Sequence, residues 1–192
     1  NSNLAVLRAL VKKGAGLDIV SGGELFRAKK AKCQGKKIVY AGVGKTAEEI
    51  RAAIKARILL FNVESMPELE QINAIAKKMR KKVNVSLRIN PNVDPHTHEY
   101  ITTGKAETKF GIDFEKAREI FITAQARNPG SAAILVGAGS VALNQGLLDP
   151  AINCFEKARN LFPEGNRRDK RYIAATLGLA SAKALQGKFP DT

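Results

Sequence analysis

Short apolar runs alternate with amphipathic segments through the first half of the chain, and this alternation constrains the fold more than any other feature. Apolar residues at helical spacing precede the first run and fill each gap between the runs. Strands separated by helices of roughly 10–16 residues are typical of βαβ units with a parallel sheet. The sequence therefore predicts an α/β fold with about four βα units, either an open sheet or a partial (β/α)8 TIM-like barrel. The four apolar runs are Leu17–Val20, Lys37–Ala41, Ile58–Val63 and Val83–Ile89.

Residues that favour a helix N-terminus follow the predicted strands, where this pattern places the helices. Gly22-Gly23 opens the segment after the first run, and Pro67 lies at a permitted first-turn position after the third. Thr46 is a good N-cap, and Glu49 three residues later completes a capping box. These signals support helices in the gaps between the strands.

The polar residues that follow the strands are the first candidates for chemistry. Asp18, Asn62, Glu64 and Arg88 lie at strand exits, the end at which α/β barrels carry their active sites. No Gly-x-Gly-x-x-Gly follows the first strand, and Ala41–Thr46 resembles a Walker loop only superficially because it lacks the leading glycine. We therefore expect no nucleotide loop.

The basic charge of the chain is uneven and says little about partners. The formal net charge is +14, of which residues 1–112 contribute +11 and residues 113–192 contribute +3. The lysine and arginine clusters fall at predicted helix ends, where the helix dipole favours cations. Since no aromatic residues alternate with them and tryptophan is absent, a solvated face is favoured over a nucleic-acid partner.

Composition narrows the cellular setting. No apolar stretch is long enough to span a bilayer, and the start of the chain has no signal-peptide pattern. The two cysteines form no disulfide framework and have no metal-ligand spacing. We expect a cytoplasmic protein with no membrane partner and no metal site.

Five segments follow one another over roughly residues 1–115: Gly16–Leu25, Lys37–Gly44, Phe61–Ser65, Leu87–Pro91, and Asp94–Gly104 with Lys109–Ile112. In this order they resemble the diaminopimelate decarboxylase family, fold-type III (alanine-racemase-like) enzymes that use pyridoxal phosphate. The resemblance implies that Asp18, Arg88 and Lys109 lie near the cofactor, with Asp18 buried beside its ring. It also implies the loss of CO2 from meso-diaminopimelate to give lysine, and a homodimer.

Departures from the family pattern matter as much. The family's Schiff-base lysine lies in a Lys-Ala-Asn segment, and Asn1-Ser2-Asn3 resembles only the end of it, so we assign no catalytic residue. The family's later histidine strand, glycine-rich phosphate loop and C-terminal β-domain are not found. His96 and His98 are expected to be surface residues of a long loop. We expect a fragment or a fusion that is inactive by itself.

The second half has a 34-residue period, which is that of the tetratricopeptide repeat. The resemblance predicts α-helical tetratricopeptide-like hairpins in 113–192, after a partial pyridoxal-phosphate barrel in 1–112. Leu135 and Ala142 stand where the repeat expects tryptophan and tyrosine. The repeated pairs are Ala117 and Ala151, Phe121 and Phe155, Ala124 and Ala158, and Pro129 and Pro163.

Two alternatives stay open at this point. In one, Ile134–Ser140 and Tyr172–Ala180 are strands of an eroded barrel instead of helices. In the other, the chain is a non-catalytic scaffold whose helical repeats hold a protein or peptide partner in a concave groove.

Overall fold

The computed structural model describes residues 2–90, 111–163, 166 and 168–187. The chain divides into two compact units, residues 1–112 and residues 113–192, called here the N-terminal unit and the C-terminal unit. The N-terminal unit contains α1 (Leu4–Lys12), β1 (Leu17–Ile19), α2 (Gly22–Lys30), a 3-10 turn (Gly35–Lys37), β2 (Ile38–Tyr40), α3 (Ala47–Lys55), β3 (Leu60–Val63), α4 (Met66–Lys78) and β4 (Val85–Leu87).

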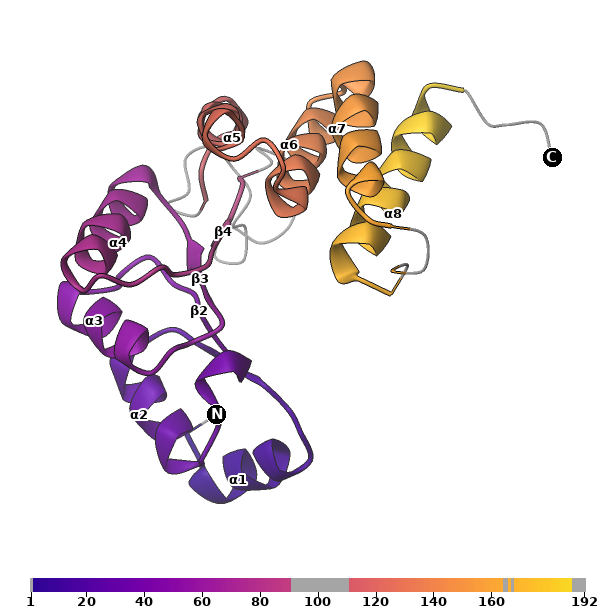
Figure 1. The fold of residues 1–192 in the computed structure, drawn as a ribbon. Coiled ribbons are helices and arrows are strands. Elements are labelled where there is room, and N and C mark those ends of the chain that lie inside the picture. Colours follow the sequence, from indigo (N-terminus) through magenta and orange to yellow (C-terminus); the bar gives the residue numbers. More distant parts are fainter. Residues whose placement is uncertain (1, 91–110, 164–165, 167, 188–192) are drawn as a thin grey trace, which may run out of the picture. The chain divides into compact units, whose positions relative to one another are not determined.

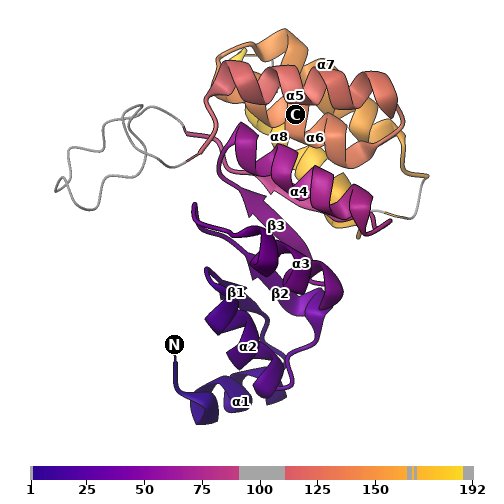
Figure 2. The same ribbon diagram turned by 90° about the vertical axis from the view of Figure 1, so that its left-hand side faces the viewer.

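The four strands form a parallel sheet in the order β1-β2-β3-β4. Each strand therefore pairs with the next one in the sequence, as in a succession of βαβ units. Figure 2 shows β1, β2 and β3 following one another in chain order. Ile112 adds a parallel bridge to Ile89 beyond β4. This succession confirms the expected α/β class with a parallel sheet.

Helices cover one face of this sheet. Ile38, Tyr40, Phe61 and Val63 are completely buried on that face, and Figure 1 shows α2, α3 and α4 along one side of the strands. Side chains of the opposite face, such as Asp18, are half-buried or exposed. The apolar runs are therefore not covered on both sides within this unit. In a closed barrel the open face would be the interior.

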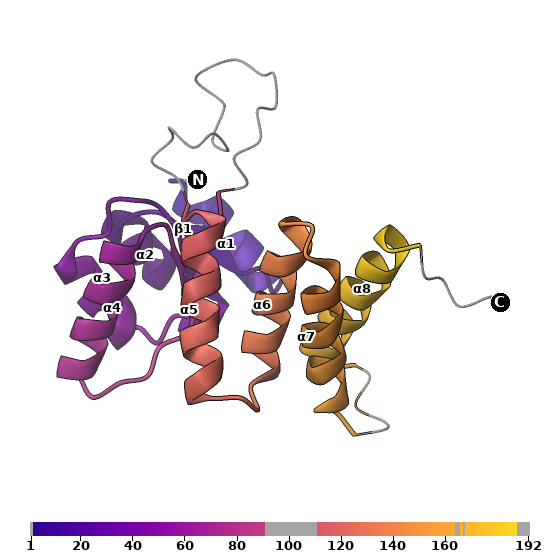
Figure 3. The same ribbon diagram turned by 90° about the horizontal axis from the view of Figure 1, so that it is seen from above.

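The C-terminal unit is entirely helical in its described residues. It contains α5 (Phe114–Arg127), α6 (Ala132–Asn144), α7 (Leu148–Asn160) and α8 (Lys170–Leu185), which follow one another in Figure 3. Phe155 of α7 is buried with Ala142, Ala151, Leu179 and Ala182. The core of this unit is thus formed by α6, α7 and α8 around one aromatic side chain.

The eroded-barrel alternative for the second half is wrong. Ile134–Ser140 lies within α6 and Tyr172–Ala180 lies within α8. The glycines that suggested a strand serve close packing instead, because a Cβ on Gly137 would lie 2.3 Å from Cε1 of Phe121. A helical glycine costs about 1 kcal/mol relative to alanine, and here it leaves room for an aromatic ring.

None of the described helices is long and apolar enough to cross a membrane. Among the described residues, no three His, Cys, Asp or Glu side chains are grouped so that they could hold a metal ion.

Candidate functional site at the strand ends

The polar residues that follow the strands gather at the carboxyl end of the sheet. Asn62 pairs with Ser86 across β3 and β4, and side chains two positions apart on a strand share a face. The alternation therefore directs Asp18, Asn62, Ser86 and Arg88 to the open face of the sheet. This is the end and the side at which α/β barrels bind their substrates.

Arg88 forms an ion pair with the buried carboxylate of Glu64. Its Nη1 lies 3.2 Å from Oε2 and 3.3 Å from Oε1 of Glu64. Only 2% of the Glu64 side chain is exposed, against 41% of the Arg88 side chain. The backbone N–H of Gly42 donates a further hydrogen bond to Glu64 Oε1, at 3.3 Å. A buried carboxylate thus orients a guanidinium group that still faces solvent.

Lys45 is joined to this pair through Glu68, and its side chain is fully buried. Its Nζ donates to Glu68 Oε1 at 2.6 Å, to the Gly42 carbonyl at 2.7 Å and to the Asn62 carbonyl at 2.8 Å. Three acceptors match the three hydrogens of an ammonium group. The centroid of the Tyr40 ring lies 5.6 Å from the same nitrogen. Lys45 therefore serves as an internal tie between β2, β3 and α4, and not as a nucleotide-loop lysine.

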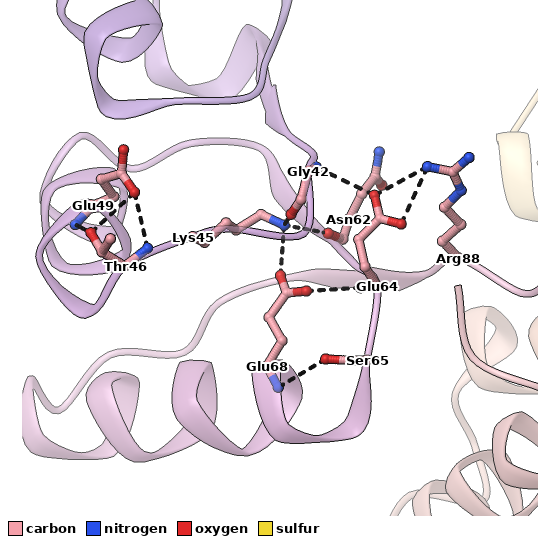
Figure 4. Close-up of polar contacts among 9 residues, drawn as sticks. All are labelled: Gly42, Lys45, Thr46, Glu49, Asn62, Glu64, Ser65, Glu68 and Arg88. Carbon is pink, nitrogen blue, oxygen red and sulfur yellow. Dashed lines mark hydrogen bonds and ion pairs between the residues drawn. The ribbon is translucent and has the colours of Figure 1, made fainter. Parts of the chain in front are cut away.

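Glu68 links the two ion pairs. Its Oε2 accepts the backbone N–H of Glu64 at 2.9 Å, while its Oε1 binds Lys45 (Figure 4). We call Lys45, Glu68, Glu64 and Arg88 the strand-end cluster. Its two cations lie at the ends and its two carboxylates lie between them, so the four charges sum to zero.

The turns after β1 and β3 have the same local construction. Ser21 and Ser65 cap α2 and α4 with almost identical backbone angles, and each accepts the N–H of a glutamate three residues on. Glu24 Oε2 in turn accepts the N–H of Val20, just as Glu68 does for Glu64. The two turns are therefore variants of one strand-to-helix connection.

The carboxylate of Glu49 connects α2 to α3. Glu49 completes the predicted capping box with Thr46 and also accepts the Gly22 N–H at 2.6 Å. Hydrogen bonds from the backbone of Thr46 and Gly22 lower the pKa of Glu49. The stability that these bonds add is present above the unfolded-state pKa and is lost as the pH falls through the folded-state pKa. Burial, and then the charge of Glu49, raise the pKa of the Tyr40 hydroxyl.

Asp18 is exposed among the described residues, and its expected burial beside the cofactor ring stays a prediction. It lies on β1, on the open face of the sheet, where no described element of this unit covers it. Arg88 follows β4 at the other edge, three interstrand steps or about 14 Å across the sheet. One molecule would contact both only by crossing β2 and β3. Lys109, His96 and His98 lie outside the described residues.

Gly111 holds the backbone next to Arg88, and its replacement by alanine gives a testable effect. Its φ is +86°, and a Cβ there would lie 2.8 Å from the Asn90 nitrogen and 3.1 Å from the Arg88 carbonyl oxygen. We expect Gly111→Ala to destabilise the N-terminal unit by about 1–3 kcal/mol, since the left-handed conformation and the clash add.

Urea unfolding with hydrogen exchange in peptides spanning β4 measures that loss. Gly44→Ala is the matched control, because nothing lies within 4 Å of a Cβ at Gly44, and its effect should stay within about 0.5 kcal/mol. Equal losses in the two variants would contradict the assigned role of Gly111.

Sequence reasoning found Glu64 and Arg88 as strand-exit residues but missed their ion pair and the link from Glu64 to Glu68 and Lys45. The available signal was the Ser-x-x-Glu spacing that both turns share. Chemically, the cluster presents one oriented guanidinium group at the mouth of the sheet. Such a group binds anionic oxygens of a phosphate, phenolate or carboxylate with directional, charge-assisted hydrogen bonds.

Known proteins share these segments. Residues 1–131 match the family described as "Pyridoxal-dependent decarboxylase, pyridoxal binding domain". Diaminopimelate decarboxylase of Aquifex aeolicus is 51% identical over 119 residues, which are 62% of this chain and 28% of that protein. The enzyme of Methanocaldococcus jannaschii is 52% identical over 115 residues, or 60% of this chain and 26% of that protein.

A solved structure agrees with this match. Diaminopimelate decarboxylase from Helicobacter pylori aligns with 97% of this chain and 52% of that chain, at 34% identity and a TM-score of 0.65. The chain spans between a quarter and a third of the length of the two curated relatives described above. Because the family match covers more than half of the chain, this chain belongs to the pyridoxal-dependent decarboxylases, through their pyridoxal-binding domain.

Proposed function

We propose that the N-terminal unit is the first part of the cofactor-binding barrel of a diaminopimelate decarboxylase. The observation that carries the proposal is the identity of 51% over 119 residues and 52% over 115 residues with two such enzymes. The reaction would release CO2 from meso-diaminopimelate and leave lysine. The structures from Helicobacter pylori and Methanocaldococcus jannaschii are complexes with L-lysine, which agrees with a site for that product.

The described residues fit part of what pyridoxal phosphate needs. Arg88 supplies a cation for an anionic oxygen, and Glu64 fixes its direction at 3.2 Å. Asp18 supplies a carboxylate on the open face for a ring nitrogen or a substrate ammonium. We include Lys109 as a third cofactor residue by its place in the motif. The bound cofactor would supply an electron sink for the carbanion formed when CO2 leaves.

A chimera tests this function. Residues 1–112 would replace the matched segment of the Aquifex aeolicus enzyme, whose remaining parts supply the rest of the barrel. We expect the chimera to release CO2 from meso-diaminopimelate. An inactive chimera that is folded and dimeric by sedimentation would contradict the proposal.

Arg88 should matter in that chimera through its charge. We expect Arg88→Ala to lower kcat/KM by about 100-fold, since one lost electrostatic contact at a reacting centre costs about that much, and Arg88→Lys to lose less. Arg51→Ala, an exposed arginine on α3, is the matched control. A loss equal to that of the control would remove Arg88 from the site.

The chain by itself should not bind the cofactor covalently at one position. With pyridoxal phosphate and borohydride, we expect labelling spread over exposed lysines and no single modified site in the peptide map. Lys45 should stay unmodified, because its side chain is fully buried and its nitrogen has three partners. One stoichiometrically modified lysine would contradict this expectation.

A second function, supported by the packing of α7, concerns the C-terminal unit. We propose that its helices are tetratricopeptide-like hairpins that bind a peptide. A Cβ on Gly139 would lie 2.8 Å from the Phe155 ring, and one on Gly178 would lie 2.4 Å from it. Phe155 lies against glycines of two neighbouring helices, and a second aromatic residue, Phe121, stands 34 residues earlier, which agrees with such a repeat. Residues 113–192 alone should be helical by circular dichroism and melt cooperatively; an unfolded fragment would contradict the idea.

A further inference from the structure

Charge is segregated within the N-terminal unit. Its described acidic residues lie in or just after a strand, or in the first two turns of the following helix: Asp18, Glu24, Glu48, Glu49, Glu64, Glu68 and Glu70. Most of its cations lie at the opposite ends of the helices or in the loops beyond them, including Lys55, Arg57, Lys77, Lys78, Arg80, Lys81 and Lys82. The end of the sheet away from Arg88 is therefore strongly positive.

A cavity of about 430 Å³ opens at this positive end, between the C-termini of α3 and α4. Its inner wall is apolar and includes Ile54, Phe61 and Met79. Its rim carries four cations and no acidic residue: Lys55, Arg57, Lys81 and Lys82. Cavities of roughly 300–1,000 Å³ with apolar walls and a few polar groups are typical of small-molecule sites.

Helix dipoles do not account for this rim. Each helix C-terminus carries about half a negative charge, so two helix ends offset about one of the four positive charges. Lys81 and Lys82 also lie beyond the last turn of α4. Among the described residues, none of the four rim cations forms an ion pair. An unbalanced cluster of cations around an apolar cavity therefore needs another explanation.

The backbone in the wall of the cavity has a left-handed conformation at Arg57. Arg57 has a φ of 52°, in the left-handed region that disfavours residues other than glycine. Gly35 packs against this turn so closely that a Cβ would lie 2.0 Å from the Ala56 carbonyl oxygen. The backbone that places Lys55 and Arg57 at the rim is thus fixed by a neighbouring segment.

We propose that this cavity binds a small amphipathic organic anion. Its apolar or aromatic body would lie against Phe61 and Met79, and one phosphate, sulfonate or carboxylate group would be held by the rim cations. The cavity lies at the N-terminal side of β3 and β4, opposite the strand ends where Arg88 and Asp18 lie. The ligand would therefore be a second molecule, bound independently of the proposed cofactor.

The fluorescent anion 1-anilinonaphthalene-8-sulfonate is a suitable probe, because it joins an aromatic body to one negative charge. Titrated into the full chain, it should show a component that weakens at least tenfold in Lys81→Glu/Lys82→Glu. Lys77→Glu/Lys78→Glu is the matched control, since it makes the same charge change in the last turn of α4 but outside the cavity. Affinity in the control should change less than twofold.

Two controls separate the cavity from general effects. The neutral analogue N-phenyl-1-naphthylamine should bind both double variants equally, because the rim acts only on charge. Circular dichroism should give the same melting temperature for the wild-type chain and both variants. If binding of the probe weakened equally in the two double variants, the overall positive charge of the protein would explain the binding. If it weakened in neither, the probe would be binding to exposed apolar surface. Either result overturns the proposal.

Discussion

Replacement of Glu68 by methionine is expected to destabilise the N-terminal unit by about 3–5 kcal/mol, because it leaves the Lys45 ammonium buried without a counter-ion. The Lys45 side chain has no exposed surface, and Glu68 Oε1 lies 2.6 Å from its nitrogen. Two backbone carbonyls remain as acceptors, but they carry no net charge. The loss should therefore be close to that of breaking a buried ion pair.

The double variant Lys45→Met/Glu68→Met separates the pair from its surroundings. We expect it to be more stable than Glu68→Met alone, since methionine fills a similar volume and leaves no buried charge. Glu70→Met is the matched control, because Glu70 is an exposed residue of α4, and should change stability by less than about 0.5 kcal/mol.

Urea unfolding followed by hydrogen exchange in β2 and β3 peptides reports on this unit separately from the helices of the C-terminal unit. A double variant less stable than Glu68→Met would mean that Lys45 contributes mainly through its hydrogen bonds to Gly42 and Asn62. A Glu68→Met loss no larger than that of Glu70→Met would contradict the strand-end cluster as a stabilising feature.

Much of the N-terminal unit follows from local sequence. Strand and helix order came from apolar spacing, and the capping box of Thr46 and Glu49 from four consecutive residues, because both depend on neighbours within one or two turns. The ends of strands were less certain: the run Val83–Ile89 yields only Val85–Leu87 as β4. Strand length depends on the partner strand, which local sequence does not specify.

The strand-end cluster could not be predicted in the same way. Lys45 and Glu68 are far apart in sequence and meet only because β2 and β3 are adjacent in the sheet. The exposure of Asp18 likewise depends on which elements cover the open face. Family resemblance identified Arg88 without its support, because a motif names residues and does not give their contacts.

Apolar periodicity alone did not separate helix from strand in the second half. Val136–Ser140 contains two glycines and small residues that suit either state. Phe121 and Phe155, whose rings occupy the space over Gly137 and Gly139, make the helix the stable choice. The decisive information was therefore the tertiary contact between an aromatic residue and a glycine one helix away.

This contact gives the second large effect. Phe155→Ala is expected to destabilise the C-terminal unit by about 3–5 kcal/mol, as for other large-to-small changes of a fully buried aromatic residue. Only 1% of Phe155 is exposed, and its ring lies between Gly139 and Gly178. Phe162→Ala is the control, since Phe162 is half-buried and packs edge-on against Tyr172; it should cost about 1 kcal/mol.

The glycines make the prediction sharper, because the effect of one substitution should change sign. In the wild-type chain, Gly178→Ala should be destabilising, since its Cβ would lie 2.4 Å from the Phe155 ring. In the Phe155→Ala background the same methyl group enters the vacated space and gains about 1 kcal/mol of helix propensity. There Gly178→Ala should stabilise. Thermal unfolding of the four chains, with hydrogen exchange in α6, α7 and α8, measures the cycle. A Gly178→Ala effect of the same sign in both backgrounds would mean that the ring does not occupy this space.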